Sequence, residues 1–212
     1  MAYELPEKSY SATVSLETLL FFQKLSKKYS TPQRVQRLLR EDFVYNTELH
    51  GESVASAMST WERKVAHCFE ASMLAGAILE HVGYPPLVLS LESKDHLDHV
   101  LFVFKEKSGW GAISRSREEG LHGRAPVFRS LQALARSYAD PYVDESARLT
   151  GYGLSHLDAT GTPWRDSPRN LWQAEQHLVH LKHRALVTSE KRYQILLKNF
   201  KENPTPPEAH WW

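Results

Sequence analysis

Apolar residues recur at helical spacing in the N-terminal part of the chain. The segment 15–29 places its leucines and phenylalanines on one broad apolar face, and Ser15 is suited to cap the start of this helix. A second helix is predicted to begin at Thr31 and Pro32, because threonine caps helices well and proline fits the first helical position. The apolar residues up to Phe43 keep the helical spacing. The pattern therefore predicts two amphipathic helices, followed by a polar loop.

The middle of the chain changes from a helical to an extended pattern. His67–Val82 (HCFEASMLAGAILEHV) predicts a long apolar helix, and Gly83 is a typical residue to end it. Three short apolar runs follow and predict strands: Leu87–Leu91, His99–Phe104 and Trp110–Ser114. Ser108 and Gly109 supply a turn between the last two runs, so we expect those two to form an antiparallel hairpin.

The C-terminal part returns to helices. Residues 130–139 predict a short helix that Pro141 ends, and Tyr152–Leu157 fits either a strand or an irregular segment. Two further helices are expected over about 168–186 and 189–200. The order of elements predicts an α+β fold in which helices pack on one small antiparallel sheet.

We expect a single domain over residues 1–200, followed by a tail at 201–212 that contains three prolines after Glu202. Within the domain, residues 1–60 supply N-terminal helices, 61–160 the core with the candidate site, and 165–200 C-terminal helices.

The composition narrows the classes of function. The chain has 212 residues with 42% hydrophobic and 24% charged residues, and its formal net charge of +1 argues against a dedicated nucleic-acid binder. No apolar run approaches the roughly 18 residues of a membrane span, and the charged N-terminus is unlike a signal peptide. A single cysteine excludes an internal disulfide framework. We therefore expect a cytoplasmic protein without membrane or nucleic-acid partners.

The single cysteine, Cys68, lies in the first turn of the predicted helix that starts near His67. Unpaired backbone N–H groups and the positive end of the helix dipole favour a thiolate there, and the thiolate is the nucleophilic form. The same N–H groups are placed to stabilise the oxyanion of a tetrahedral intermediate. A buried structural cysteine is the alternative interpretation.

The residues around Cys68 resemble the transglutaminase-like superfamily over about a quarter of the chain. Members have an acidic residue two positions after the cysteine, here Glu70, and an apolar helix that ends in a turn similar to Gly83-Tyr84-Pro85. Their histidine opens the first strand of a hairpin, and the return strand carries a tryptophan; His99 and Trp110 occupy these positions. The resemblance implies a papain-like α+β fold in which His99 is the base for Cys68.

The sequence departs from the family pattern four residues after Trp110. The family commonly has an aspartate there that orients the histidine, and this chain has Ser114. A hydroxyl can fix the tautomer of the ring but supplies no charge. The alternatives are a Cys–His dyad, a triad with Ser114, a carboxylate from elsewhere, or a fold that has lost its chemistry. Asp158 is a freer candidate for that carboxylate than Asp98, whose strand neighbour His99 points to the opposite face.

Three residues are candidates for substrate binding. Trp61 lies seven residues before Cys68 and is placed to line an acyl pocket. Trp110 is a candidate for substrate binding because of its position in the hairpin. Arg115 belongs to a group of arginines just beyond the hairpin that also includes Arg117, Arg124 and Arg129, and such a group is suited to a carboxylate or phosphate. A solvated loop is the alternative interpretation of these arginines, and core packing that of the tryptophans.

Two histidine clusters raise the alternative of a metal site. The segment from Asp95 to His99 (DHLDH) combines carboxylates and imidazoles, but its spacing fits no closed zinc pattern. His177, His180 and His183 recur every three residues on a predicted helix and share a broad face. A polar loop and exposed helix positions explain these patterns without a ligand.

We therefore expect a cysteine-dependent acyl-transfer enzyme that acts on a peptide or small amide substrate, with Cys68, His99 and Ser114 at the catalytic site and no metal or organic cofactor. Hydrolysis, as in a peptidase or amidase, is favoured over transfer to an amine. One rival is a binding module that keeps the fold without the chemistry, and a second is a metal-dependent hydrolase. The sequence leaves the oligomeric state open.

Overall fold

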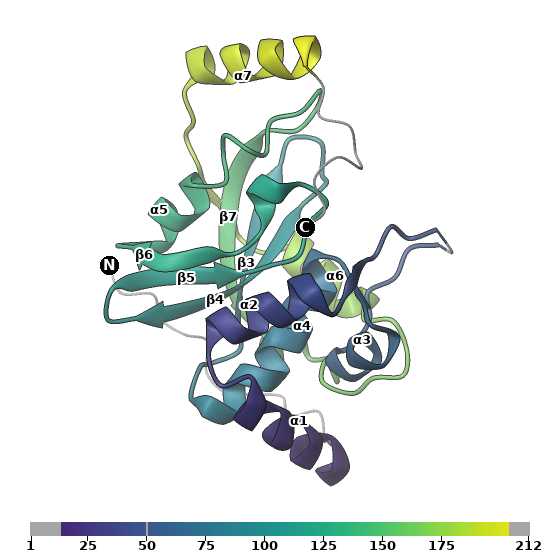
Figure 1. The fold of residues 1–212 in the computed structure, drawn as a ribbon. Helices are drawn as coiled ribbons and strands as arrows, with labels where there is room; N and C mark the ends of the chain where they lie inside the picture. The colour runs from purple at the N-terminus through teal and green to yellow at the C-terminus, as the bar shows by residue number, and fades with distance from the viewer. Residues whose placement is uncertain (1–13, 50, 204–212) are drawn as a thin grey trace.

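The centre of the protein is a six-stranded antiparallel sheet with the strand order β6-β5-β4-β3-β7-β8 (Figure 1). The structure is a computed structural model that describes residues 14–49 and 51–203. The strands are β3 (Leu87–Ser93), β4 (His99–Glu106), β5 (Gly109–Ile113), β6 (Arg124–Phe128), β7 (Leu149–His156) and β8 (Arg184–Ala185). The predicted α+β class is therefore confirmed, including the β4–β5 hairpin, in which Glu106 pairs with Gly109.

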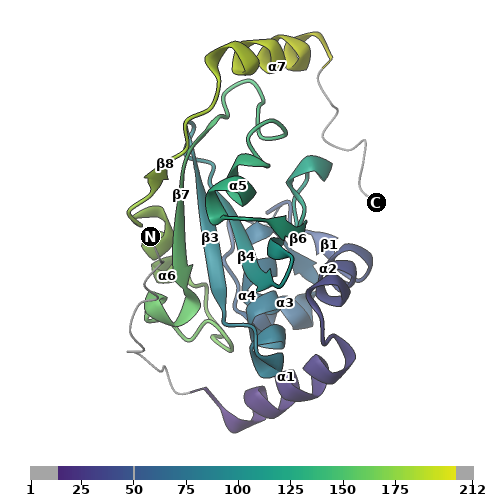
Figure 2. The same ribbon diagram turned by 90° about the vertical axis from the view of Figure 1, so that its left-hand side faces the viewer.

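Helices cover both faces of this sheet (Figure 2). One face packs against α1, α2, α3, α4 and α6, and the other against α5. The helices are α1 (Leu16–Lys28), α2 (Pro32–Glu41), α3 (Ala57–Arg63), α4 (Cys68–Leu79), α5 (Leu131–Arg136), α6 (Trp172–Val179) and α7 (Glu190–Glu202), with short 3-10 turns η1 (Glu80–Val82), η2 (Glu119–Leu121) and η3 (Leu157–Thr160).

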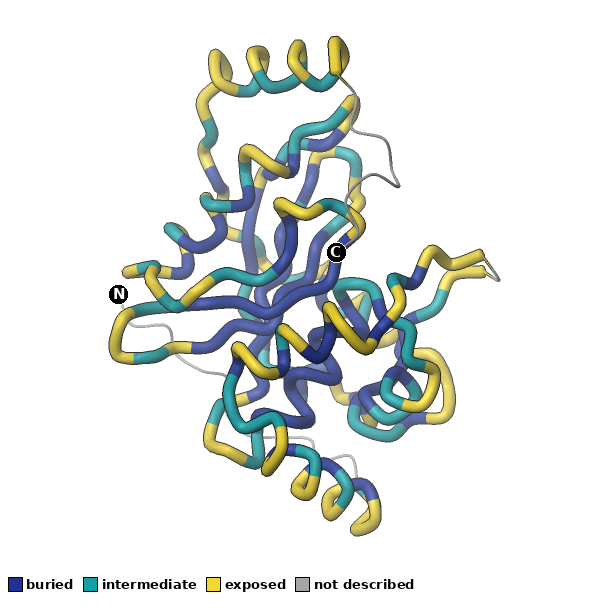
Figure 3. Tube along the Cα trace, in the orientation of Figure 1, coloured by how far each residue is buried: buried dark blue, intermediate teal, exposed yellow. Residues whose placement is uncertain are grey.

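Burial on both faces explains the nearly continuous apolar runs of the central strands. In β4, Val100 and Phe102 belong to the core on the α4 side, whereas Leu101 and Val103 belong to the core on the α5 side. Side chains alternate along a strand, so a strand covered on both faces needs apolar residues at every position. Figure 3 shows the result: α4 and the central strands are buried, while the outer sides of α1 and α7 are exposed.

The N-terminal helices begin where the sequence predicted. The Ser15 hydroxyl accepts a hydrogen bond from the Thr18 amide at 3.1 Å, and the Thr31 hydroxyl accepts one from the Arg34 amide at 3.3 Å. After α2, the short strand β1 (Val44–Tyr45) pairs in parallel with β2 (Val65–Ala66). This pairing places the loop after β1 beside the start of α4.

The predicted helix over 168–186 is wrong in its extent. Helix α6 starts at Trp172, after a loop in which the Asn170 side chain accepts a hydrogen bond from the Val54 amide, and it ends at Val179. The chain then forms β8, which pairs with the edge of β7, and Leu186 is buried. The backbone groups of β8 form hydrogen bonds with the edge strand β7. In a longer helix the same groups would have formed hydrogen bonds within the helix instead. The segment Tyr152–Leu157, for which the sequence allowed either a strand or an irregular structure, lies mainly within strand β7.

Several elements were not predicted from the sequence, among them β1, β2, β8, β6 and α3. Strand β6 lies in the arginine-containing segment that we interpreted as a loop, and its Pro126 is tolerated because β6 is an edge strand of the sheet. Helix α3 is capped by Ser56, whose hydroxyl accepts a hydrogen bond from the Ser59 amide.

Helices α1 and α7 lie at opposite ends of the molecule (Figures 1 and 2). The last helix ends at Glu202, so most of the predicted tail, residues 204–212, lies outside the described part of the chain. Over residues 14–49 and 51–203, every helix is too short or too polar to cross a bilayer.

Candidate functional site

Cys68 is the first residue of α4, and His67 caps that helix. The cap is reciprocal: the Phe69 amide donates to Nδ1 of His67 at 3.2 Å, while the His67 amide donates to the carboxylate of Glu70 at 3.1 Å. From Phe69 onward every residue of α4 is buried, whereas Cys68 is partly exposed. The thiol therefore lies at the amino end of a buried helix, where the helix dipole favours its thiolate form.

The side chain of Glu70 holds the helix start to the preceding loop. It is fully buried, and its two oxygens accept hydrogen bonds from four groups. These donors are the His67 amide, the Ala55 amide, the Asn46 side chain and the Ser53 hydroxyl, at 3.0–3.3 Å. Glu70, the acidic residue two positions after the cysteine, is therefore the group whose hydrogen bonds fix where α4 begins.

His99 is the first residue of β4, and its imidazole lowers the pKa of the Cys68 thiol. Its Nε2 lies 2.9 Å from the carbonyl oxygen of Leu121 and 3.3 Å from Oγ of Ser114. A carbonyl can only accept, so Nε2 carries the proton, and Ser114 accepts from the same group while it donates to the carbonyl of Val100 at 3.2 Å. This tautomer leaves Nδ1 with its lone pair, and Nδ1 is the nitrogen free to exchange a proton with the thiol.

The two imidazoles control the ionisation of Cys68. Burial alone would raise the pKa of the Cys68 thiol, but hydrogen bonds from His67 and His99 and the positive charges of these rings hold it well below its usual value. Burial would also lower the pKa of His67, yet the neighbouring thiolate, the charge of Glu70 and the Ser53 carbonyl together raise it to about 9. The two imidazoles therefore favour the thiolate form of the sulfur.

Cys68 and His67 line a cleft with a volume of about 640 Å³. Its walls come from the loop after β1, the loop before β4 and helix α6, which contributes Trp172 and Glu175. The charged groups along these walls are mainly acidic: Glu48, Glu52, Asp98 and Glu175, against Arg117. A carboxylate-rich cleft disfavours a thiolate, so the positive charge that stabilises it has to come from the imidazoles.

The structure brings Cys68, His99 and Ser114 together but places the three predicted substrate-binding residues elsewhere. Trp61 packs against Phe21 and Phe43, with ring centroids 5.8 and 6.1 Å away, and Trp110 packs against the core on the α5 side. The buried Arg115 donates a hydrogen bond to the carbonyl of Phe43 at 3.3 Å, and none of the three lines the cleft.

Sequence reasoning missed several residues of the cleft wall. Arg117 was noticed only as part of an arginine group, and Trp172 was not expected to lie at the site. Tyr45 and Glu175 carried no signal in the sequence, because the loop after β1 and helix α6 meet Cys68 only through the tertiary fold. The pattern of apolar residues along a helix or strand predicts which of its faces is buried in the core. It does not predict which polar residues from distant segments come together at the cleft.

The two aspartates considered as orienting groups for His99 have other partners. Asp98 accepts a hydrogen bond from the Ser93 amide at 3.0 Å. Asp158 accepts from the Trp164 indole at 2.8 Å and from Arg165 at 2.9 Å, and these bonds hold its pKa below the usual value although burial opposes the shift. The ring of His99 is therefore oriented by uncharged groups, the carbonyl of Leu121 and the hydroxyl of Ser114.

The other clusters named from the sequence have structural partners. His177 and His183 exchange hydrogen bonds with Ser155 and Ser90, and Arg124 donates to backbone carbonyls that include that of Gly120. Among the residues that the structure describes, no group of three or more His, Cys, Asp or Glu side chains is arranged to hold a metal ion.

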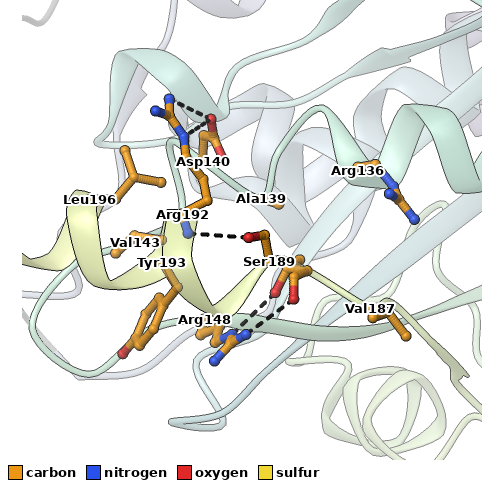
Figure 4. Close-up of a pocket in the computed structure, with 11 residues that line it drawn as sticks. Arg136, Ala139, Asp140, Val143, Arg148, Val187, Ser189, Arg192, Tyr193 and Leu196 are labelled. Carbon is orange, nitrogen blue, oxygen red and sulfur yellow. Dashed lines mark hydrogen bonds and ion pairs between the residues drawn. The ribbon is translucent and has the colours of Figure 1, made fainter.

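A second, smaller cavity of about 170 Å³ lies under α7 (Figure 4). Two of its three arginines are paired within the protein: Arg192 with Asp140 at 3.0 Å, and Arg148 with the Thr188 hydroxyl at 3.1 Å and with Glu190. These pairs attach α7 to the end of β7 and the loop after α5. The cavity therefore belongs to a helix attachment and not to a reactive site.

Replacement of Ser114 with alanine is expected to reduce the reactivity of Cys68 by less than about tenfold. The Leu121 carbonyl is the shorter of the two contacts to Nε2 and preserves the tautomer, and a hydroxyl contributes only about 1 kcal/mol. The measurement is the second-order rate of alkylation by iodoacetamide at neutral pH, with Ser116→Ala as a matched control. A loss of a hundredfold or more would assign the orienting role to Ser114 alone.

No family model and no curated protein matches the chain.

Proposed function

We propose that the protein is a cysteine-dependent acyl-transfer enzyme that acts on amide or peptide bonds, with Cys68 as the nucleophile and His99 as its acid and base. The observation that carries the proposal is the position of the sulfur. It lies at the amino end of α4, on the wall of a cleft large enough for a peptide segment, and the imidazoles of His67 and His99 lower the pKa of its thiol. A structural cysteine needs none of these features.

The first half of the reaction makes a thioester. The thiolate of Cys68 attacks the carbonyl carbon of the substrate, so a C–S bond forms and the carbonyl oxygen becomes an oxyanion. The backbone N–H of Cys68 has no partner within the helix because it is the first helical residue, and it donates to that oxyanion. The thiol proton of Cys68 passes to Nδ1 of His99 when the thiolate forms, and His99 then gives this proton to the nitrogen of the leaving amine as the oxyanion collapses and the C–N bond breaks.

The second half restores the enzyme. Neutral His99 removes a proton from water through Nδ1, and the resulting hydroxide attacks the thioester carbon. The C–S bond breaks, the carboxylic acid leaves, and Cys68 is again a thiolate. An amine in place of the water would give transfer instead of hydrolysis. We favour hydrolysis, which makes the protein a peptidase or amidase.

The arrangement of elements supports a transglutaminase-like, papain-like assignment of the fold. The nucleophile starts the buried helix α4, the next strand is β3, and the base opens the β4–β5 hairpin. The departure at Ser114 is compatible with catalysis, because the ring also has a backbone acceptor. A Cys–His pair depends less on a charged orienting group than a serine nucleophile does, since the thiol ionises more readily.

Mass spectrometry of the intact protein with a panel of peptidyl p-nitrophenyl esters and peptidyl amides tests the proposal. We expect the mass of one acyl group to appear on the protein, to map to Cys68, and to disappear as the carboxylic acid product accumulates. In His99→Ala the release of product is expected to slow by about 10²–10⁴-fold, the usual contribution of general acid–base catalysis.

Two outcomes would contradict the proposal. Acyl transfer to a residue other than Cys68, or product release that is unchanged in His99→Ala, would remove the assigned roles. An inert thiol with retained binding of peptides in the cleft would instead favour the rival function, a binding module. Trp61→Phe serves as a folding control, because Trp61 packs in the core away from the cleft.

A further inference from the structure

The cleft that contains Cys68 is acidic, although the chain as a whole is nearly neutral. The formal net charge of the chain is +1. Among the described residues, the charged groups of the cleft wall are four carboxylates, those of Glu48, Glu52, Asp98 and Glu175, and one arginine, Arg117. Even with the wall histidines His67 and His96 charged, the carboxylates outnumber the cations around the nucleophile. This excess of negative charge at a proposed active site bears on which substrates the cleft accepts.

Two of the four carboxylates have partners within the protein. Asp98 accepts a hydrogen bond from the Ser93 amide at 3.0 Å. Glu48 accepts one from the Ser53 amide at 2.9 Å, and its carboxylate lies 3.7 Å from Nε2 of His67. These two side chains therefore help to hold the loops that form the cleft.

The other two carboxylates, those of Glu52 and Glu175, line the cleft without a partner. Within the described part of the chain, neither side chain forms a hydrogen bond or an ion pair. Elsewhere a partly buried carboxylate has an arginine, as Glu80 does at 2.6 Å from Arg165. Burial raises the pKa of the partly exposed Glu175 carboxyl, and the charge of Glu52 raises it further, although His67 opposes the shift. A cation beside Glu175 would therefore be bound favourably.

Helix α6 presents an exposed indole next to Glu175. Trp172, Glu175 and Val179 all line the cleft, and residues three or four positions apart are neighbours on one face of a helix. Trp172 is 42% exposed and Val179 is 48% exposed. The carboxylate of Glu175 therefore lies between two apolar side chains that are open to the cleft.

Trp172 differs from the other described tryptophans in having no cation over its ring. In the other three, a lysine or arginine of the protein lies 3.0–5.6 Å from the ring centroid: Lys64 over Trp61, Lys105 over Trp110 and Arg165 over Trp164. Within the part of the chain that the structure describes, Trp172 has no such partner. The face of an indole attracts a cation, and the adjacent Glu175 adds a full negative charge to that attraction. The pair is therefore suited to a cation that comes from outside the protein.

We propose that the cleft selects substrates with a basic side chain, which lies over the indole of Trp172 and pairs with the carboxylate of Glu175 while Cys68 attacks a nearby carbonyl. Glu52, in the loop after β1, adds to the negative field. Arginine suits this site better than lysine, because its planar guanidinium both stacks on an aromatic ring and donates to a carboxylate. The catalytic meaning of this preference rests on the proposed function, but the binding preference itself does not.

The test measures peptide binding to the Cys68→Ala protein, which lacks the nucleophile. The probes are alanine pentapeptides with blocked ends that carry one arginine at each position in turn. Matching peptides carry citrulline, which has nearly the shape of arginine but no charge. Calorimetry gives a dissociation constant for each peptide, and the ratio within a pair is the selectivity for charge. We expect the best arginine peptide to bind at least about tenfold more tightly than its citrulline partner, as a charge-assisted hydrogen bond and a stacked cation together supply.

Two variants in the Cys68→Ala background assign this selectivity to its residues. Glu175→Gln removes the charge and should lower the selectivity about three- to tenfold. Trp172→Leu keeps an apolar surface without an aromatic face and should lower it about threefold. Glu145→Gln is the matched control, because it removes an exposed carboxylate that lies outside the cleft wall, and it should leave the selectivity unchanged. The selectivity is a ratio measured on one protein, so a smaller folded fraction affects both of its members alike.

The sign of the effect is tested with Arg117→Gln and with salt. Arg117 is the arginine of the cleft wall, so its removal makes the cleft more negative and should raise the selectivity for arginine peptides. An increase in salt from about 0.05 to 0.5 M should weaken binding of the arginine peptides and leave the citrulline peptides unaffected, because salt screens charges.

Two results would overturn the proposal. One is equal affinity for the arginine and citrulline peptides, which includes the absence of binding by both. The other is a selectivity that Glu175→Gln leaves at its original value.

Failure of this proposal is distinguishable from failure of the proposed function. If the wild type forms an acyl-enzyme equally fast with arginine and citrulline peptidyl esters, the proposed function stands and the preference for basic substrates is refuted. If Cys68→Ala binds arginine peptides selectively but Cys68 of the wild type is never acylated, the proposed function alone is refuted.

Discussion

Replacing Cys68 with alanine is expected to reduce turnover of every amide substrate to the uncatalysed background, a loss of at least about 10⁴-fold, while the protein stays folded. The sulfur is the only atom removed, and without it no covalent intermediate forms. The remaining N–H donor and the cleft bind substrate but contribute only the residual acceleration that such groups supply in other hydrolases.

The fold should tolerate this change because Cys68 is the first, partly exposed residue of α4 and alanine is an excellent helix residue. We expect the free energy of unfolding, measured with urea, to change by less than about 1 kcal/mol. Cys68→Ser is the matched control for shape, since its hydroxyl stays protonated where the thiol ionises; it should be nearly as inactive as the alanine variant. Turnover retained in either variant would refute the assignment of the nucleophile.

Replacing Glu70 with alanine is expected to lower the free energy of unfolding by about 3–5 kcal/mol, the largest stability effect that we predict at the site. The carboxylate is fully buried and accepts four hydrogen bonds from the loop and the helix start. Its removal leaves buried donors without acceptors, and each such group costs about 1 kcal/mol or more. The measurement is urea unfolding followed by circular dichroism.

Glu52→Ala is the matched control for this second prediction. Glu52 is an exposed carboxylate on the wall of the same cleft, so its loss should change the unfolding free energy by less than about 0.5 kcal/mol. If Glu70→Ala were equally mild, the hydrogen-bonded carboxylate would not be the group that fixes the start of α4. Glu70→Gln should fall between the two, because an amide keeps one acceptor oxygen.

Much of the site could be predicted from local sequence. The apolar run after His67 predicts α4 and places Cys68 at a helix start without any tertiary information, although α4 ends at Leu79 and Gly83 instead ends the 3-10 turn η1 that follows. The turn that the sequence predicts at Ser108 and Gly109 lies one residue earlier, at Lys107 and Ser108, but it still defines the β4–β5 hairpin and therefore the strand that begins at His99. These inferences hold because helix caps, helix ends and tight turns depend on residues a few positions apart.

The remaining features depend on segments that are distant in the sequence. The acceptor for His99 is a backbone carbonyl, that of Leu121, and a carbonyl carries no sequence signal because every residue has one. The binding surface likewise differs from the one we expected: Trp61 packs in the core, whereas Trp172 from α6 lines the cleft.

The sequence by itself determined the α+β class, the helix that presents the only cysteine and the strand that presents His99, because periodicity and turn chemistry are local properties. Only the tertiary structure decided that His67 faces the same sulfur, that Glu70 anchors the helix start from inside the core, and that a carbonyl orients the base. Hydrogen bonds to backbone groups and the charge around a partly exposed sulfur are set by which segments pack together, and a linear pattern does not encode that packing.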